Sequence, residues 1–209
     1  DAQQNVSADK MILLPTNYKD NYTSFAGALP YAIDRTETDL TLSQIVEVAI
    51  KRLSSYDRFF VMAEGGKIDY AGHANDGATV LQEVMDFDAA IQVAYQFYLQ
   101  HPDETLIVVT ADHETGGMAL GNSDYTLNLK VLDNQKCSLD KLSDLLSELH
   151  QSMGKKLQWK QVKNLIADNT GLYTKVEVTD EEDACLKAAF NSMMSNKDVV
   201  KTLYKDINA

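Results

Sequence analysis

The chain has 209 residues, of which 44% are hydrophobic, and it carries a formal net charge of −12 with a pI of about 4.6. This length and hydrophobic fraction are typical of a globular protein of one or two domains, and they exclude a disordered chain. The negative charge argues against binding to nucleic acid or to an anionic membrane. The sequence has no apolar run of about 20 residues, so it predicts no membrane span.

The N-terminal part of the chain predicts a short strand, an irregular segment and a helix. Residues 10–14 form an apolar run that ends at a proline. Residues 16–39 contain several turn formers, and we expect their aromatic side chains to be packing anchors. Asp39 and Thr41 are candidate caps of a helix that runs to about Ser54, because the apolar residues after them follow helical spacing.

Two further apolar runs, residues 59–63 and 106–111, each lead into a cluster of acidic and imidazole side chains. Runs of this length predict buried parallel strands, and residues 77–100 between them have a helical pattern. A strand–helix–strand unit crosses over with a right hand, which brings the two loops to one edge of the sheet. The sequence therefore predicts a single site at that edge.

The residue types in the two clusters are suited to metal binding. Glu64, Asp69 and Asp112 offer oxygen ligands, and His73 and His113 offer nitrogen ligands. Mixed sets of Asp and His suit zinc, whereas an all-oxygen position suits magnesium. Asp69 and His73 would share a face if the chain coils helically, and the adjacent Asp112 and His113 would need a tight turn to converge. Either pair alone is usually structural, but both pairs with Glu64 in one short region favour a metal site.

The two clusters resemble the metal-binding motifs of bacterial alkaline phosphatases. The first reads Glu-Gly-Gly-Lys-Ile-Asp-Tyr-Ala-Gly-His-Ala-Asn at residues 64–75, and the second reads Thr-Ala-Asp-His-Glu-Thr-Gly-Gly at residues 110–117. The resemblance extends over about residues 10–121 and weakens beyond. It implies an α/β fold, with a mostly parallel sheet flanked by helices, of which residues 1–121 form a partial core.

The resemblance also implies a function for each ligand. Asp69 and His73 would bind one zinc ion, Asp112 and His113 a second zinc ion, and Glu64 a magnesium ion. The implied reaction is hydrolysis of phosphate monoesters through a phosphoserine intermediate. The family further implies a periplasmic or secreted location, with a homodimer of the full-length protein as an option. Lys67 could meet a substrate phosphate, but we expect it to be a solvated surface lysine.

Several parts of the family pattern are absent from the 209 residues. They lack the Asp-Ser-Ala or Asp-Ser-Gly nucleophile motif, so no catalytic serine is predicted, and they lack the Gly-His-Thr stretch that supplies a further zinc ligand. The chain begins at Asp1 without a signal peptide, which indicates a fragment of a longer protein. Each zinc ion would keep two protein ligands, fewer than the three that catalytic zinc normally takes. We therefore expect the isolated chain to bind metal weakly and to have little or no activity.

Other functions stay open at this point. The chain could be a catalytically inactive fragment or an interaction module that has kept the metal loops. It could also belong to a related sulfatase or a metal-dependent phosphoglycerate mutase. The spacing from Glu64 to Asp69 favours the alkaline phosphatase branch.

Residues 122–209 predict a short strand at residues 127–132 followed by a helical subdomain. Ser138 begins one amphipathic helix, Trp159 marks a second, Thr179 begins a third and residues 198–207 form a fourth. The subdomain is expected to be a packed addition, with a lid or a dimer contact as alternatives. The sequence does not decide whether its two cysteines, Cys137 and Cys185, form a disulfide or are ordinary thiols.

Overall fold

The computed structural model describes residues 29–118 and 129–195. The strand predicted at residues 10–14 and the helix predicted at residues 198–207 lie outside these residues. Within the described parts the chain divides into two compact units. The first unit comprises residues 29–70 and 80–115, and the second comprises residues 71–79, 116–118 and 129–195. The predicted domain boundary near Gly121 stays a prediction.

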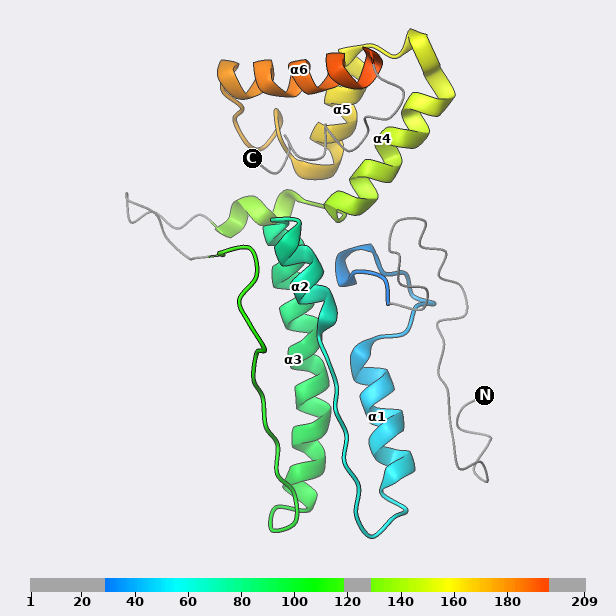
Figure 1. The fold of residues 1–209 in the computed structure, drawn as a ribbon, viewed down its shortest axis with the longest axis vertical. Coiled ribbons are helices and arrows are strands. Elements are labelled where there is room, and N and C mark those ends of the chain that lie inside the picture. Colours follow the sequence, from blue (N-terminus) through cyan, green and yellow to red (C-terminus); the bar gives the residue numbers. More distant parts are fainter. Residues whose placement is uncertain (1–28, 119–128, 196–209) are drawn as a thin grey trace. The chain divides into compact units, whose positions relative to one another are not determined.

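The regular elements of residues 29–118 are all helices (Figure 1). They are a 3₁₀ helix η1 (Ala32–Asp34) and the α-helices α1 (Leu42–Leu53), α2 (Gly66–His73) and α3 (Gly77–Gln100). The predicted helices at Thr41–Ser54 and at residues 77–100 are confirmed. No helix in the described parts of the chain is both long and apolar enough to cross a membrane.

Helix α1 begins at a reciprocal cap. The Thr41 hydroxyl accepts a hydrogen bond from the Gln44 backbone N–H at 3.1 Å, and the Gln44 side chain accepts one from the Thr41 N–H at 3.0 Å. This arrangement satisfies two backbone donors that have no partner within the helix. Ser54 ends the helix, and its backbone N–H donates to the Ile50 carbonyl at 2.8 Å.

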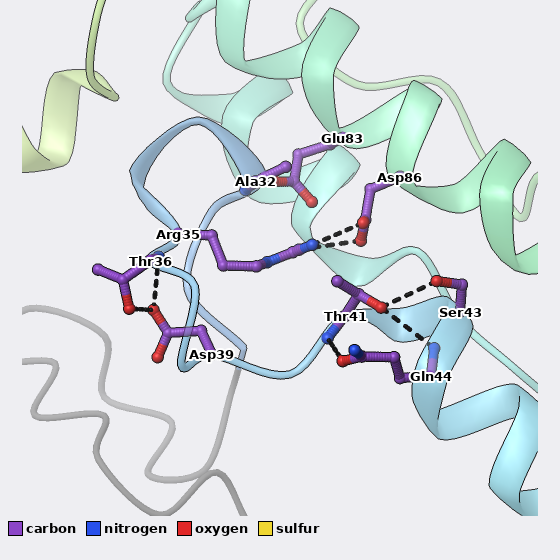
Figure 2. A network of polar contacts seen from close by, with 9 residues as sticks. All are labelled: Ala32, Arg35, Thr36, Asp39, Thr41, Ser43, Gln44, Glu83 and Asp86. Atoms are coloured by element: carbon purple, nitrogen blue, oxygen red, sulfur yellow. Dashed lines mark hydrogen bonds and ion pairs between the residues drawn. The ribbon is translucent and has the colours of Figure 1, made fainter.

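The loop before α1 is attached to α3 by charged side chains (Figure 2). Both terminal nitrogens of Arg35 donate to the Asp86 carboxylate, at 2.6 and 2.9 Å, in a bidentate pair. One turn away, the Ala32 backbone N–H donates to Glu83 at 2.6 Å. Burial raises the pKa of Glu83, and its hydrogen bond with Ala32 opposes that rise only in part. These contacts fix the segment before α1 against the middle of the long helix.

The predicted parallel sheet is not found in the part of the chain that the structure describes. Residues 59–63 and 106–111 are extended, but neither pairs with another strand, and the one β-bridge in these parts joins Leu172 to Val176. Phe60 and Leu106 are 85% and 87% exposed, so the runs are not buried either. The physical reason is that a strand is stabilised only by a neighbour that accepts and donates its ladder hydrogen bonds.

The first of these extended segments, residues 59–63, nevertheless runs alongside α3 toward the first motif (Figure 1). The rings of Phe59 and Phe97 meet edge to face at 5.6 Å between centroids. At the other end of the segment, a Cβ added at Gly65 would lie 3.1 Å from the ring of Phe87. Helix α3 therefore serves as the support on which the loop before Asp69 rests.

The second unit contains the predicted helical subdomain. Its elements are η2 (Leu129–Asn134), α4 (Leu139–Met153), η3 (Gly154–Lys156), α5 (Trp159–Thr170) and α6 (Asp180–Ser195). Helix α5 contacts both α4 and α6. Their facing side chains form the hydrophobic core of the unit, whose buried members are Cys137, Leu139, Leu142, Leu146, Leu157, Val162, Ile166, Ala189, Phe190 and Met193.

The start and stop signals of these helices are confirmed. The Ser138 hydroxyl accepts from the Lys141 N–H at 3.0 Å, and Thr179 and Glu182 form a capping box at the start of α6. Gly171, at φ +78°, ends α5 in the left-handed conformation. Cys137 is buried and Cys185 is exposed, and no disulfide joins these two cysteines.

The prediction of a strand at residues 127–132 is wrong for its described part, because Leu129 begins the 3₁₀ helix η2. Local hydrogen bonds explain the difference. The Asn134 side chain donates to the Val131 carbonyl at 2.9 Å, and the Gln135 N–H donates to the Leu132 carbonyl at 3.2 Å. These bonds satisfy the carbonyls within the segment, whereas a strand would need a partner strand.

Candidate metal centre

Helix α2 carries the first predicted ligand pair. The chain after Gly66 is helical, as the pairing required, so Asp69 and His73 lie four positions apart on the same helix face. Asp69 is partly buried, whereas His73 is exposed at the end of the helix. Asp69 belongs to the first unit and His73 to the second. A zinc ion shared by these two side chains stays a prediction.

A threonine hydroxyl joins the two motifs. Thr115 Oγ1 donates to Asp69 Oδ1 at 2.7 Å, across 46 residues of sequence, and lies 3.2 Å from His113 Nδ1. Asp69 and His113 were predicted to bind different zinc ions, and the structure brings both to the same hydroxyl. The sequence reasoning missed Thr115, although its place two residues after His113 in the motif was a signal that could have been used.

The second predicted pair, Asp112 and His113, converges through a bend. The His113 backbone N–H donates to Asp112 Oδ1 at 3.0 Å, and His113 Nε2 lies 3.6 Å from Asp112 Oδ2. The pKa of His113 is raised, first by the Glu114 carbonyl at 3.1 Å from Nδ1 and then by the charge of Asp112. Both side chains are exposed, so they are accessible to an ion from solvent.

Glu64, the predicted magnesium ligand, is exposed at the end of the first extended segment. Its carboxylate turns back toward the start of α2, because a Cβ added at Gly66 would lie 3.1 Å from Glu64 Oε1. Gly66 therefore gives the carboxylate the space beside the helix terminus. The magnesium assignment stays a prediction.

The glycine that follows Thr115 brings the second motif against the end of α2. Gly116 has φ +82°, and a Cβ added there would lie 2.3 Å from the Gly72 carbonyl oxygen. No side chain fits in that gap, so only glycine permits this approach. The motifs thus meet at two places, Asp69 with Thr115 and Gly72 with Gly116.

Lys67 lies inside the molecule, so the prediction of a solvated surface lysine is wrong. The residue is 7% exposed, and its Nζ lies 4.3 Å from the ring centroid of Tyr31 and 5.4 Å from that of Tyr70. An ammonium group over an aromatic face is attracted by the electron-rich ring. Because Tyr31 lies in the described part of the irregular segment, residues 29–39, the lysine joins that part to the first motif. The expectation that Tyr31 is a packing anchor agrees with its burial.

The donor types fit the implied metals, but the donor number does not. Carboxylate oxygens and imidazole nitrogens from Asp69, Asp112 and His113 are the ligands that zinc accepts. Within residues 29–118 and 129–195, however, no group of three or more His, Cys, Asp or Glu side chains is arranged to hold a metal ion. The described residues therefore supply an incomplete set of ligands.

Comparisons with known proteins identify the class. The fold resembles the crystal structure of a cold-active alkaline phosphatase from the psychrophile Shewanella sp., with a TM-score of 0.64 and 30% identity over 86% of this chain. Alkaline phosphatase 4 of Bacillus subtilis is 32% identical over 87% of this chain, and the repressible alkaline phosphatase of Saccharomyces cerevisiae is 33% identical over 69%. These similarities define the class of protein as one with the alkaline phosphatase fold. The described parts of this chain do not contain the sheet of that fold.

The family model for alkaline phosphatase matches residues 24–201 of the 209. The chain therefore belongs to the alkaline phosphatase family, as its two motifs predicted. It spans 36% of the length of the Bacillus relative, 29% of the yeast relative and 40% of the Shewanella chain.

Proposed function

We propose that this chain supplies part of the metal site of an enzyme that hydrolyses phosphate monoesters. The observation that carries the proposal is the hydrogen bond from Thr115 to Asp69, with His113 beside the same hydroxyl. Two segments that lie 46 residues apart thus present an acid and an imidazole together. That arrangement has no evident use in packing, because His113 and its neighbour Asp112 are both exposed.

The residues are assigned to metals by family membership and donor chemistry. Asp69 and His73 would hold one zinc ion, Asp112 and His113 a second zinc ion, and Glu64 a magnesium ion. When bound, such ions polarise phosphoryl oxygens and make a bound water a stronger nucleophile. The cations would also reverse the local repulsion between a phosphate ester and a protein of net charge −12.

The protein's own groups orient the ligands. The Thr115 hydroxyl donates to one oxygen of Asp69 and thereby helps to fix the orientation of that carboxylate. The Glu114 carbonyl next to His113 Nδ1 favours a proton on that nitrogen, so Nε2 would be the nitrogen that binds the metal. The ligand count, with no group of three in the described residues, supports weak metal binding by this chain alone.

Zinc titration of the purified chain by calorimetry tests the assignment. We expect wild-type protein to bind Zn²⁺ more weakly than micromolar, and Asp69→Asn to weaken that binding further. Asp103→Asn, on an exposed turn after α3, removes the same charge and should leave binding unchanged. Stoichiometric sub-micromolar binding by wild type would contradict the incomplete site. Equal binding by the two variants would contradict the assignment of Asp69.

The activity is tested in a protein in which another segment provides the remaining metal ligands. We propose that co-expression with the rest of the family's catalytic domain gives turnover of phosphate monoesters in preference to sulfate esters, and that Asp69→Ala abolishes it. Export to the periplasm or the medium is proposed on family grounds and is checked by cell fractionation. The alternative, an inactive fragment or interaction module, predicts no turnover in the reassembled protein.

A further inference from the structure

Asp76, three residues after His73, is a buried carboxylate with four hydrogen-bond donors. It is 3% exposed. Oδ1 accepts from the Thr79 backbone N–H at 3.2 Å and from the Gln135 side chain at 2.7 Å. Oδ2 accepts from the Thr79 hydroxyl at 2.7 Å and from the Leu139 backbone N–H at 2.8 Å. A carboxylate is buried without a large penalty only when it is satisfied to this extent.

This one carboxylate lies at the beginning of two helices. Helix α3 begins at Gly77, and the N–H of Thr79 belongs to its first turn. Helix α4 begins at Leu139, 63 residues after Asp76, and its first N–H points at the same side chain. The first turns of helices carry unpaired N–H groups and a partial positive charge, and a carboxylate stabilises both. Asp76 therefore ties η2 and α4 to the chain just after the first motif.

The backbone between His73 and Asp76 is a closed turn. The Asn75 N–H donates to the Gly72 carbonyl at 2.9 Å, and the Asp76 N–H donates to the Ala71 carbonyl at 3.0 Å. Asn75 adopts φ +53°, a conformation that fixes the direction of the turn. With both hydrogen bonds in place, little freedom is left between the Asp76 side chain and the Cα of His73.

We propose that Asp76 is a positioning residue for His73, and that the helical segment from η2 to α4 is therefore part of the metal centre's support. The carboxylate holds the turn in place against Gln135 and Leu139. This turn determines the position of the His73 Cα, from which the imidazole side chain extends. The proposal rests on the proposed function for its effect on metal binding. Its effect on the geometry of His73 does not depend on that function.

A purely stabilising Asp76 would have different consequences. Its removal would lower the stability of the second unit, as the loss of any core contact would, without a selective effect on His73. Ile166→Val provides the matched control, because Ile166 is fully buried in the core of the same unit and distant in sequence from the turn. It lowers stability without altering the contacts of Asp76.

The test uses the full 209-residue chain and two measurements. The first is the imidazole resonance of His73 in zinc-free protein by NMR, and the second is Zn²⁺ affinity by titration. We expect Asp76→Asn to shift the His73 resonance and to weaken zinc binding by about 10- to 100-fold, the range for groups that orient metal ligands. Ile166→Val should change neither. Should Asp76→Asn fail to fold, Gln135→Leu removes one of the four donors and should shift the same resonance by less.

The outcomes separate this proposal from the proposed function. If wild type binds no zinc but Asp76→Asn still shifts the His73 resonance selectively, the metal assignment fails and the positioning role stands. If the His73 resonance is unchanged in Asp76→Asn and in Gln135→Leu, the positioning role is overturned. It is equally overturned if Ile166→Val shifts the resonance as much as Asp76→Asn does.

Discussion

At the scale of single residues, the motif glycines are as informative as the predicted ligands. Gly116 and Gly117 both have positive φ, at +82° and +67°, but their surroundings differ. A Cβ at Gly116 would collide with the Gly72 carbonyl, whereas a Cβ at Gly117 would meet nothing within 4 Å. Substitutions at Gly116 and Gly117 therefore distinguish two contributions to stability. One is the free energy of the left-handed backbone conformation, and the other is the free energy lost when the close approach between the motifs is disturbed.

We predict that Gly117→Ala lowers the free energy of unfolding by about 1–2 kcal/mol, the cost of a left-handed conformation for an L-residue. Gly116→Ala should cost more, because the backbone at Gly72 must also move. Urea denaturation of both variants measures the difference. Equal losses of stability would show that the contact between Gly116 and Gly72 is absent in solution.

At the scale of elements, helices α5 and α6 are joined by a charged cluster at Asp183. Lys163 on α5 donates to Asp183 on α6 at 3.2 Å, and Lys187, one turn further along α6, lies 3.0 Å away. The neighbouring ammonium groups, Lys187 first, lower the pKa of Asp183 below its ordinary value of 3.8. A carboxyl with a lowered pKa stabilises the fold above its ordinary pKa, and this contribution is lost as the pH falls through the lowered value.

We predict that Asp183→Asn lowers the free energy of unfolding by about 0.5–1 kcal/mol at neutral pH, a modest amount because the cluster is partly exposed to solvent. The difference from wild type should start to shrink as the pH falls below about 4 and should vanish only below the lowered pKa of the folded state, where the carboxyl is protonated in both states. Urea denaturation across this pH range measures it, with Asp168→Asn, an exposed aspartate on α5, as control. A difference that stays constant with pH would contradict the charge assignment.

At the scale of the whole molecule, the two compact units differ in their cores. The second unit has one cluster of buried side chains, in which Leu146 is 1% exposed. The first unit relies on polar ties such as Arg35 with Asp86, and it leaves its apolar extended segments exposed. Large exposed apolar patches mark surfaces that other chains or segments cover.

We predict that Leu146→Ala lowers the stability of the second unit by about 2–5 kcal/mol, because it leaves a cavity in the core. Hydrogen exchange should accelerate in α4, α5 and α6 and stay unchanged in α1, which belongs to the first unit. Mass spectrometry of exchange in peptides from both units measures this. Acceleration of equal size in α1 would mean that the chain unfolds as one cooperative unit.

The sequence by itself determined the helices α1, α3, α4, α5 and α6, several of their caps, and the family. Thr41, Ser138 and Gly171 act where their chemistry predicted, because a cap needs only residues within one or two turns. The two metal-binding motifs could likewise be recognised from the sequence, because the types and spacing of Asp and His indicate which metal ligands are available without knowledge of the fold. The prediction of a parallel sheet went beyond this local information, since strands form only when partner strands are present.

Only the tertiary structure decided which distant groups meet. The contact of Thr115 with Asp69, the burial of Lys67 between Tyr31 and Tyr70, and the four donors around Asp76 join residues far apart in the chain. No periodic pattern in the sequence predicts these long-range contacts. They follow from how helices and loops pack, and packing depends on shape and on the need to satisfy every buried polar group.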